Sequence, residues 1–178
     1  MSTERAEQTR PPEPWLRGTL TDVPPVVRAV LHALELAKDD VERWCTSLSD
    51  AEMNARPAGL APVAFQVRHI GRSIDRLLSY AEGKPLNERQ LAELKTEMDA
   101  GSTREELLAD FRTALLNTAG RVRAFSATDL GEARAVGKKQ LPTTVGGLLV
   151  HVAEHTQRHV GQAITTAKIL MARRANRE

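Results

Sequence analysis

The sequence predicts an all-α protein, a four-helix bundle with short extra helices and an irregular N-terminal arm. Apolar side chains recur at three- and four-residue steps in four long segments of the chain. No segment shows the strict alternation of apolar and polar residues that is typical of a half-buried strand. The length of 178 residues suits one domain. We therefore expect a single helical bundle over residues 26–178, preceded by an arm over residues 1–25.

The arm is predicted to be irregular because proline interrupts it repeatedly. A proline inside a helix removes a backbone hydrogen bond and clashes with the preceding turn. Five prolines stand in this stretch, at positions 11, 12, 14, 24 and 25. Two readings stay open for the arm: Trp15 and Leu16 hold it against the bundle, or it is partly disordered.

The first long helix is predicted from Val26 onward, where apolar residues begin to recur at helical spacing. Pro25 suits its first turn, where a missing N–H leaves no hydrogen bond unmade. Ser49 and Glu52 then match a capping box, which predicts a short helical turn after this helix. The stripe that should face the core consists of Val27, Val30, Leu34, Ala37, Val41, Trp44 and Leu48.

A second long helix is predicted from near Pro62, and it ends before Gly83. Its apolar stripe consists of Val63, Val67, Ile70, Ile74, Leu77 and Leu78. A shorter amphipathic piece follows over residues 87–99 and ends at Gly101, with an apolar side made of Leu91, Leu94 and Met98.

The third and fourth long helices are predicted from their caps and stripes. Ser102 and Glu105 match a capping box, and the stripe behind it consists of Leu107, Phe111, Leu115, Thr118, Val122 and Phe125. Residues 131–142 are polar and hold two glycines, so we expect a loop there. Thr143 or Thr144 caps the last helix, which should run to about Met171.

The composition excludes several classes of function. A formal net charge of +2 and an aromatic content of 3% argue against a nucleic-acid-binding surface. No apolar run approaches the ~20 residues that a membrane span requires, and residues 1–15 lack the apolar stretch of a signal peptide. We therefore expect a cytoplasmic protein without membrane or nucleic-acid partners. The single cysteine, Cys45, excludes an intramolecular disulfide and a cysteine-built metal site.

Three of the five histidines, His151, His155 and His159, stand four residues apart in the last predicted helix. Residues at this spacing lie one turn apart on nearly the same face, and two such imidazoles can hold one metal ion. A helical wheel places His159 inside the apolar stripe and His155 at its edge, whereas His151 lies at the rim. The spacing alone leaves two readings open, a metal site or histidines that are hydrogen-bonded within the core.

A third ligand must come from another helix. His69 lies on a flank of the second long helix that can face a second neighbour, so it is the best available partner. His32 lies opposite the apolar stripe of the first helix, and we expect it to be solvated. Gln162 can hydrogen-bond a ligand imidazole or pack within the bundle. We expect three nearby arginines to face solvent, namely Arg68, Arg72 and Arg158.

Two segments together resemble a known family. Residues 146–162 end in the pattern H-x-x-x-H-x-G-Q, which falls on His155, His159, Gly161 and Gln162. With residues 62–70, which contain His69, this pattern resembles the signature of the DinB-like superfamily of damage-inducible and YfiT-like proteins. The similarity covers roughly residues 26–171. It implies a four-helix bundle, frequent homodimers, and one divalent ion (Zn, Ni or Fe) bound by His69, His155 and His159.

The resemblance implies little about the substrate. The better understood members transfer low-molecular-weight thiols such as bacillithiol or mycothiol, or use such a thiol in an isomerisation. Three imidazole ligands leave an ion at least one open position, which is typical of catalytic rather than structural sites. Such an ion can activate a water for hydrolysis or a thiol for transfer. We therefore expect a metal-dependent thiol transferase or hydrolase that acts on a small molecule, and the alternative is a non-catalytic metal-binding or structural bundle.

Two other metal chemistries are excluded. Residues 151–155 match the H-x-x-E-H motif of inverted zinc proteases. Such a site needs an acidic ligand well downstream, and the only acidic residue after His155 is Glu178, at the end of the sequence. A di-iron carboxylate bundle needs paired Glu-x-x-His motifs, and no glutamate here stands three residues before a histidine.

Overall fold

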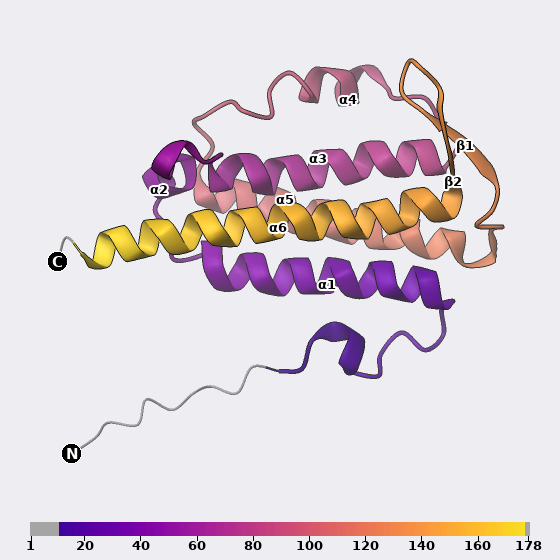
Figure 1. The fold of residues 1–178 in the computed structure, drawn as a ribbon, viewed down its shortest axis with the longest axis horizontal. Coiled ribbons are helices and arrows are strands. Elements are labelled where there is room, and N and C mark those ends of the chain that lie inside the picture. Colours follow the sequence, from indigo (N-terminus) through magenta and orange to yellow (C-terminus); the bar gives the residue numbers. More distant parts are fainter. Residues whose placement is uncertain (1–10, 177–178) are drawn as a thin grey trace.

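The structure, a computed structural model, describes residues 11–176, so the start of the predicted arm and the last two residues lie outside the described part. The described chain is a helical bundle, which confirms the predicted fold class (Figure 1). Its long helices are α1 (Pro25–Cys45), α3 (Val63–Ala81), α5 (Arg104–Arg123) and α6 (Val145–Ala175). The short ones are η1 (Pro14–Leu16), α2 (Asp50–Asn54), η2 (Pro57–Gly59), α4 (Glu88–Glu93) and η3 (Ala124–Ala127).

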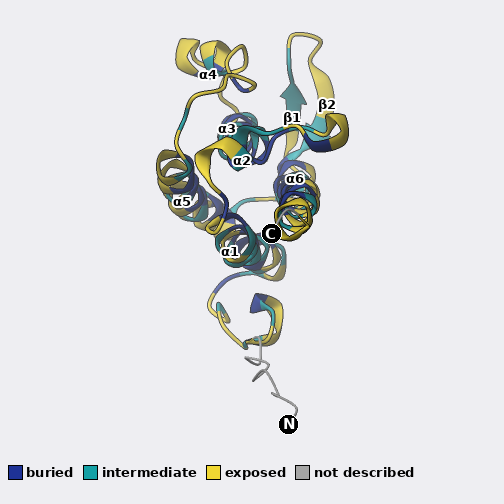
Figure 2. Cartoon of the chain, turned by 90° about the vertical axis from the view of Figure 1, so that its left-hand side faces the viewer, coloured by how far each residue is buried: buried dark blue, intermediate teal, exposed yellow. Residues whose placement is uncertain are grey.

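The long helices pack in a closed ring in the order α1, α6, α3, α5 (Figure 2). Helices α3 and α6 are antiparallel, since Gln66 lies beside His159 and His69 beside His155. Helices α3 and α5 run in the same direction (Figure 1). Parallel neighbours need a long connection, and residues 82–103, which include α4, return along the bundle to provide it. We call residues 82–103 the return segment.

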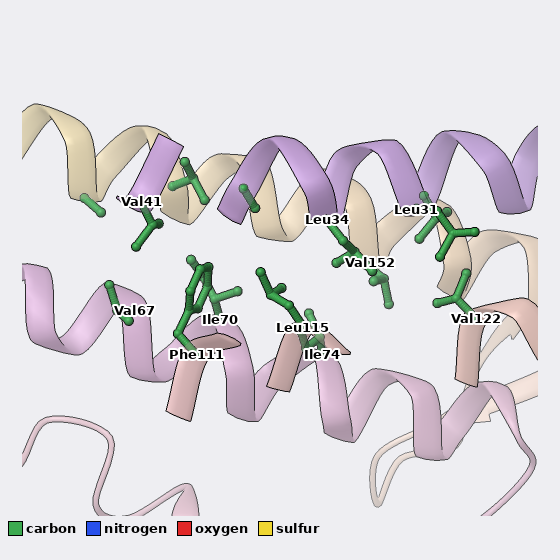
Figure 3. Packing of buried hydrophobic residues seen from close by; sticks show 14 of the residues in the cluster. Leu31, Leu34, Val41, Val67, Ile70, Ile74, Phe111, Leu115, Val122 and Val152 are labelled. Carbon is green, nitrogen blue, oxygen red and sulfur yellow. The ribbon is translucent and has the colours of Figure 1, made fainter. Parts of the chain in front are cut away.

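The core lies inside the ring, where apolar side chains of the long helices meet (Figure 3). Fully burying one large aliphatic or aromatic side chain contributes about 1.5–3 kcal/mol, so this core dominates the stability of the fold. Its largest fully buried members include Phe111, Leu48, Met53, Ile70, Ile74, Leu78 and Leu149. No helix within residues 11–176 combines the length and apolar character needed to cross a membrane.

The helix starts follow their caps closely. The capping box of Ser49 and Glu52 begins α2 as predicted. Helix α5 is capped by Thr103 with Glu106, one residue later than the predicted box. Thr144 is the cap of α6, because its hydroxyl accepts the N–H of Gly147 at 3.0 Å. Helix α6 then continues to Ala175, one turn beyond its predicted end.

The predicted loop over residues 131–142 is wrong, because part of it forms a β-hairpin. Strand β1 (Ala133–Val136) pairs antiparallel with β2 (Leu141–Thr144). Each strand has only four residues, too few to show an alternating pattern. The turn between them holds Gly137 and Gln140 at positive φ values of 71° and 50°. The hairpin leads directly into α6 and so fixes where that helix begins.

The arm is attached differently from the prediction. Trp15 and Leu16 are 62% and 58% exposed, so neither holds the arm to the bundle. Pro14 and Val23 are buried instead. The predicted solvation of His32 is also wrong, since His32 is only 6% exposed and its Nε2 lies 3.2 Å from the hydroxyl of Thr19. A helical wheel of α1 could not show this, because the arm covers the outer face of the helix.

The return segment also differs from the predicted amphipathic piece. Its helix α4 ends at Glu93, and the side chains expected to form its apolar side, Leu91, Leu94 and Met98, are each nearly half exposed. The buried residues here are Gln90 and Glu97. Polar contacts rather than apolar ones therefore hold this segment on α3.

Candidate metal centre

His69, His155 and His159 form one cluster between α3 and α6. One ligand atom from each histidine lies within 4.8 Å of the ligand atoms of the other two. The Nε2 atoms of His69 and His155 are 3.0 Å apart, and the ring centroids of His155 and His159 are 4.5 Å apart. The four-residue spacing stacks the two α6 histidines on one face. The antiparallel packing of α3 then brings His69 opposite them.

The Nδ1 atoms of two of these histidines are held by partners outside the cluster. Nδ1 of His69 lies 2.6 Å from Oε2 of Glu97, and Nδ1 of His159 lies 2.6 Å from Oε1 of Gln66. A carboxylate or amide oxygen accepts a hydrogen bond from Nδ1–H, so the lone pair of each neutral ring is on Nε2. This is the arrangement in which metal-ligating histidines are found. Both rings are thus oriented for binding through Nε2.

Glu97 is itself held by a buried ion pair with Arg76. Nη2 of Arg76 lies 2.8 Å from Oε1 of Glu97, and the two residues are 8% and 7% exposed. Burial raises the pKa of Glu97, but the hydrogen bond from His69 and the guanidinium of Arg76 outweigh it and hold this pKa below its ordinary value. Glu97 is therefore a carboxylate at neutral pH and stabilises the Nδ1–H form of His69.

His155 and His159, the two cluster histidines on α6, are uncharged at neutral pH. Burial, followed by the nearby imidazole of His69, lowers the pKa of His155 to about 4. The same two causes, in the same order, lower the pKa of His159 to about 4. Neutral imidazole is the form that ligates a metal. A metal would thus meet little competition from protons at these nitrogens at neutral pH.

These lowered pKa values predict an acid sensitivity of the metal-depleted protein. The unfolded histidines take up protons near their ordinary pKa of 6.5, whereas folded His155 and His159 do so only near 4. Between these pH values the unfolded state binds more protons, so stability falls as the pH falls from 6.5 to 4. Thermal melts at pH 7, 6 and 5 should show this fall. A variant with His155→Gln and His159→Gln should lose less stability over the same range. A parent melting temperature that is constant from pH 7 to 5 would show that the pKa values of His155 and His159 are not lowered in the folded protein.

The structure also shows the positions of His151, Gln162 and Cys45, which the sequence analysis considered. His151 lies beside the cluster with its ring centroid 5.4 Å from that of His155, and its Nδ1 contacts Glu154 at 3.0 Å. It is at the rim, as predicted. Gln162 is exposed, and no hydrogen bond is recorded between it and a histidine of the described residues. Cys45 is buried, and burial raises its pKa to about 12, so its thiol stays protonated at neutral pH.

The predicted solvent exposure of Arg68 and Arg72 is wrong. Nη1 of Arg68 donates to the carbonyls of Glu97 and Asp99 at 2.9 and 2.8 Å. Nη1 of Arg72 donates to the carbonyl of Glu93 at 3.0 Å. Both arginines therefore fasten the return segment to α3. Arg158, by contrast, is exposed on α6 and pairs with Glu154.

Glu97 and Gln66 are the site residues that sequence reasoning missed. Gln66 could have been found, because it stands three residues before His69 and therefore on a neighbouring face of the same helix. Glu97 carries no local signal, since its contact with His69 depends on the path of the return segment. The amide that contacts a cluster histidine is thus Gln66 and not Gln162.

The fold and the site together define a helical bundle with three inward-facing histidines, whose nitrogen donors suit Zn, Ni or Fe. The chain belongs to the DinB superfamily, whose family model matches residues 33–163. Among solved structures, it is similar to a conserved protein from Enterococcus faecalis, at 20% sequence identity and a TM-score of 0.59. That match covers 83% of this chain and 98% of the other, and it shows the shared fold. No curated protein matches the chain significantly.

Proposed function

We propose that His69, His155 and His159 bind one divalent metal ion and that the protein is a metal-dependent enzyme. The observation that carries this proposal is the orientation of the cluster. Three imidazoles from two helices converge, and Glu97 and Gln66 turn the lone pairs of two of them towards the shared centre. Nε2 of His69 has the ring nitrogen of His155 as its recorded neighbour at 3.0 Å, whereas no described donor is recorded for Nε2 of His159. A histidine that was merely packed in a core would need such a donor.

The number of ligands favours catalysis over a purely structural role. Three protein ligands are typical of catalytic zinc sites, whereas structural sites are closed by four. An ion held by three neutral imidazoles lowers the pKa of a water or a thiol that enters an open position, which supplies a nucleophile for hydrolysis or thiol transfer. The chain itself orients two of the three rings: the Glu97–Arg76 pair holds His69, and Gln66 holds His159.

The reaction that we propose is transfer of a low-molecular-weight thiol or hydrolysis of a small molecule. Support comes from family membership and from the open three-histidine arrangement. Protein loaded with one equivalent of Zn²⁺, Ni²⁺ or Fe²⁺ should be assayed with bacillithiol or mycothiol and a small electrophile, and separately with activated esters. We expect turnover that requires the ion, that is lost in His155→Ala, and that is retained in the matched rim variant His151→Ala.

The alternative is a bundle that uses the ion for structure alone. Full metal occupancy without turnover in either assay class would favour that alternative. The decisive comparison is between the two histidine variants, because both remove one imidazole from the same face of α6. Equal activity in the two variants would contradict a catalytic role of the cluster.

A further inference from the structure

A cavity of about 410 Å³ lies on the α5 side of α3. The histidine cluster lies on the other side of the same helix, towards α6. The cavity is bounded by α3, α5 and the return segment, and its volume is within the range of small-molecule sites. Its polar lining includes Arg68 and Arg72 from α3 and Asp110, Thr113 and Asn117 from α5.

The arginines of this cavity differ in how their charges are balanced. Arg89 pairs with Asp75 and Glu93 at 2.9 and 2.6 Å. Arg121 likewise pairs with Asp75 at 2.6 Å. Arg68 and Arg72, in contrast, form no ion pair with any described residue. Their hydrogen bonds go only to backbone carbonyls and hydroxyl groups of the return segment.

Arg72 also keeps one edge of its guanidinium free. Its recorded hydrogen bonds all start from Nη1, which leaves Nε and Nη2 without a partner among the described residues. Within residues 11–176, the only guanidinium nitrogens that are both buried and without a hydrogen-bond partner are Arg28 Nε and Arg76 Nη1. The free edge of Arg72 is not among these buried atoms, so it is accessible to solvent, and Arg72 is one of the residues that line the cavity. An edge of this shape matches the two oxygens of a carboxylate or phosphate.

The lining of the cavity also carries more positive than negative charge around Arg68 and Arg72. Arg72 stands one turn after Arg68 on α3, and both guanidinium groups donate to the return segment rather than to a carboxylate. The cavity lining holds four arginines against three acidic residues, Asp75, Glu93 and Asp110. Asp75 and Glu93 are already engaged by Arg89 and Arg121. Asp110 lies on the opposite wall and makes no ion pair with Arg68 or Arg72.

We propose that this cavity binds a small molecule through an oxyanion group, a phosphate or a carboxylate, which the free edge of Arg72 and the charge of Arg68 recognise. This site is separate from the proposed metal centre. It requires neither the histidine cluster nor a bound metal, so each proposal can fail without the other.

Isothermal titration calorimetry with inorganic phosphate, and separately with citrate, tests this proposal on the full chain at constant ionic strength. We expect saturable binding of one anion per chain, and the anion that binds more tightly identifies the group. Arg72→Gln should weaken binding by about 10- to 100-fold, as expected for loss of a charge-assisted bidentate contact. Arg43→Gln removes the same charge from the exposed face of α1 and should leave the affinity within about twofold. His155→Ala should also bind the anion normally.

Arg72→Gln could weaken binding by loosening the return segment, because Arg72 also donates to Glu93 and Thr96. A second variant therefore tests the charge of the cavity without removing these bonds. Asn117→Asp places a carboxylate on the α5 wall and leaves every bond of the return segment in place. It should weaken anion binding because it supplies a competing negative charge. Absence of saturable binding, equal affinities for Arg72→Gln and Arg43→Gln, or an unchanged affinity in Asn117→Asp would each overturn the proposal.

Discussion

Replacing Glu97 with alanine is expected to lower the free energy of unfolding of the metal-depleted protein by about 3–5 kcal/mol, since it leaves the Arg76 guanidinium buried without its counter-ion. Both side chains are 9% exposed, so solvent screens their pair only weakly. The same substitution removes the acceptor for Nδ1 of His69 and should weaken metal binding by about 10- to 100-fold. Urea unfolding and chelator competition measure the two effects separately.

Two further variants test whether the charge itself is responsible. Glu93→Ala removes a carboxylate from the same segment, but its partner Arg89 is 61% exposed and keeps its ion pair with Asp75, so a loss of at most about 1 kcal/mol is expected. A double variant, Arg76→Leu with Glu97→Leu, should regain most of the stability because no unpaired charge remains. Equal stabilities of Glu97→Ala and the parent would show that this ion pair does not hold the return segment.

Replacing His69 with alanine is expected to weaken metal binding by about 100- to 1000-fold. Structural zinc sites with four ligands bind with about 10–16 kcal/mol, or roughly 2.5–4 kcal/mol for each ligand. His69 is also the one cluster residue on α3, so its loss leaves only His155 and His159 of the cluster. Chelator competition with Zn²⁺ gives the affinity directly. His151→Ala is the matched control, and a comparable loss in that variant would show that the rim histidine is also a ligand.

The long helices and two of the cluster histidines could be predicted because their signals are local. Apolar spacing defines α1, α3, α5 and α6, and the same spacing aligns His155 with His159. His69 could be paired with them only as the best remaining histidine, until the antiparallel packing of α3 and α6 placed it opposite. Homodimer formation, the cytoplasmic location and the absence of nucleic-acid partners stay predictions.

The features that sequence reasoning missed depend on long-range contacts. Glu97 reaches His69 because the return segment crosses α3, and no local pattern encodes that path. Arg68 and Arg72 look like surface residues on a wheel of α3 alone, yet they bind the backbone of this segment. A wheel of α1 likewise places His32 at the surface, because the arm that covers it lies outside that helix. A helical wheel describes one helix, whereas these residues are contacted by segments outside their own helix.

The most direct test of the metal centre is the number of ions bound to each chain. Untagged protein is stripped with a chelator, refilled with micromolar Zn²⁺, Ni²⁺ or Fe²⁺, freed of excess ions and analysed by mass spectrometry for metal content. We predict close to one ion per chain in the parent and in His151→Ala, and little in His155→Ala. A parent protein that retains none of these ions at micromolar supply would contradict the assignment of His69, His155 and His159 as a metal site.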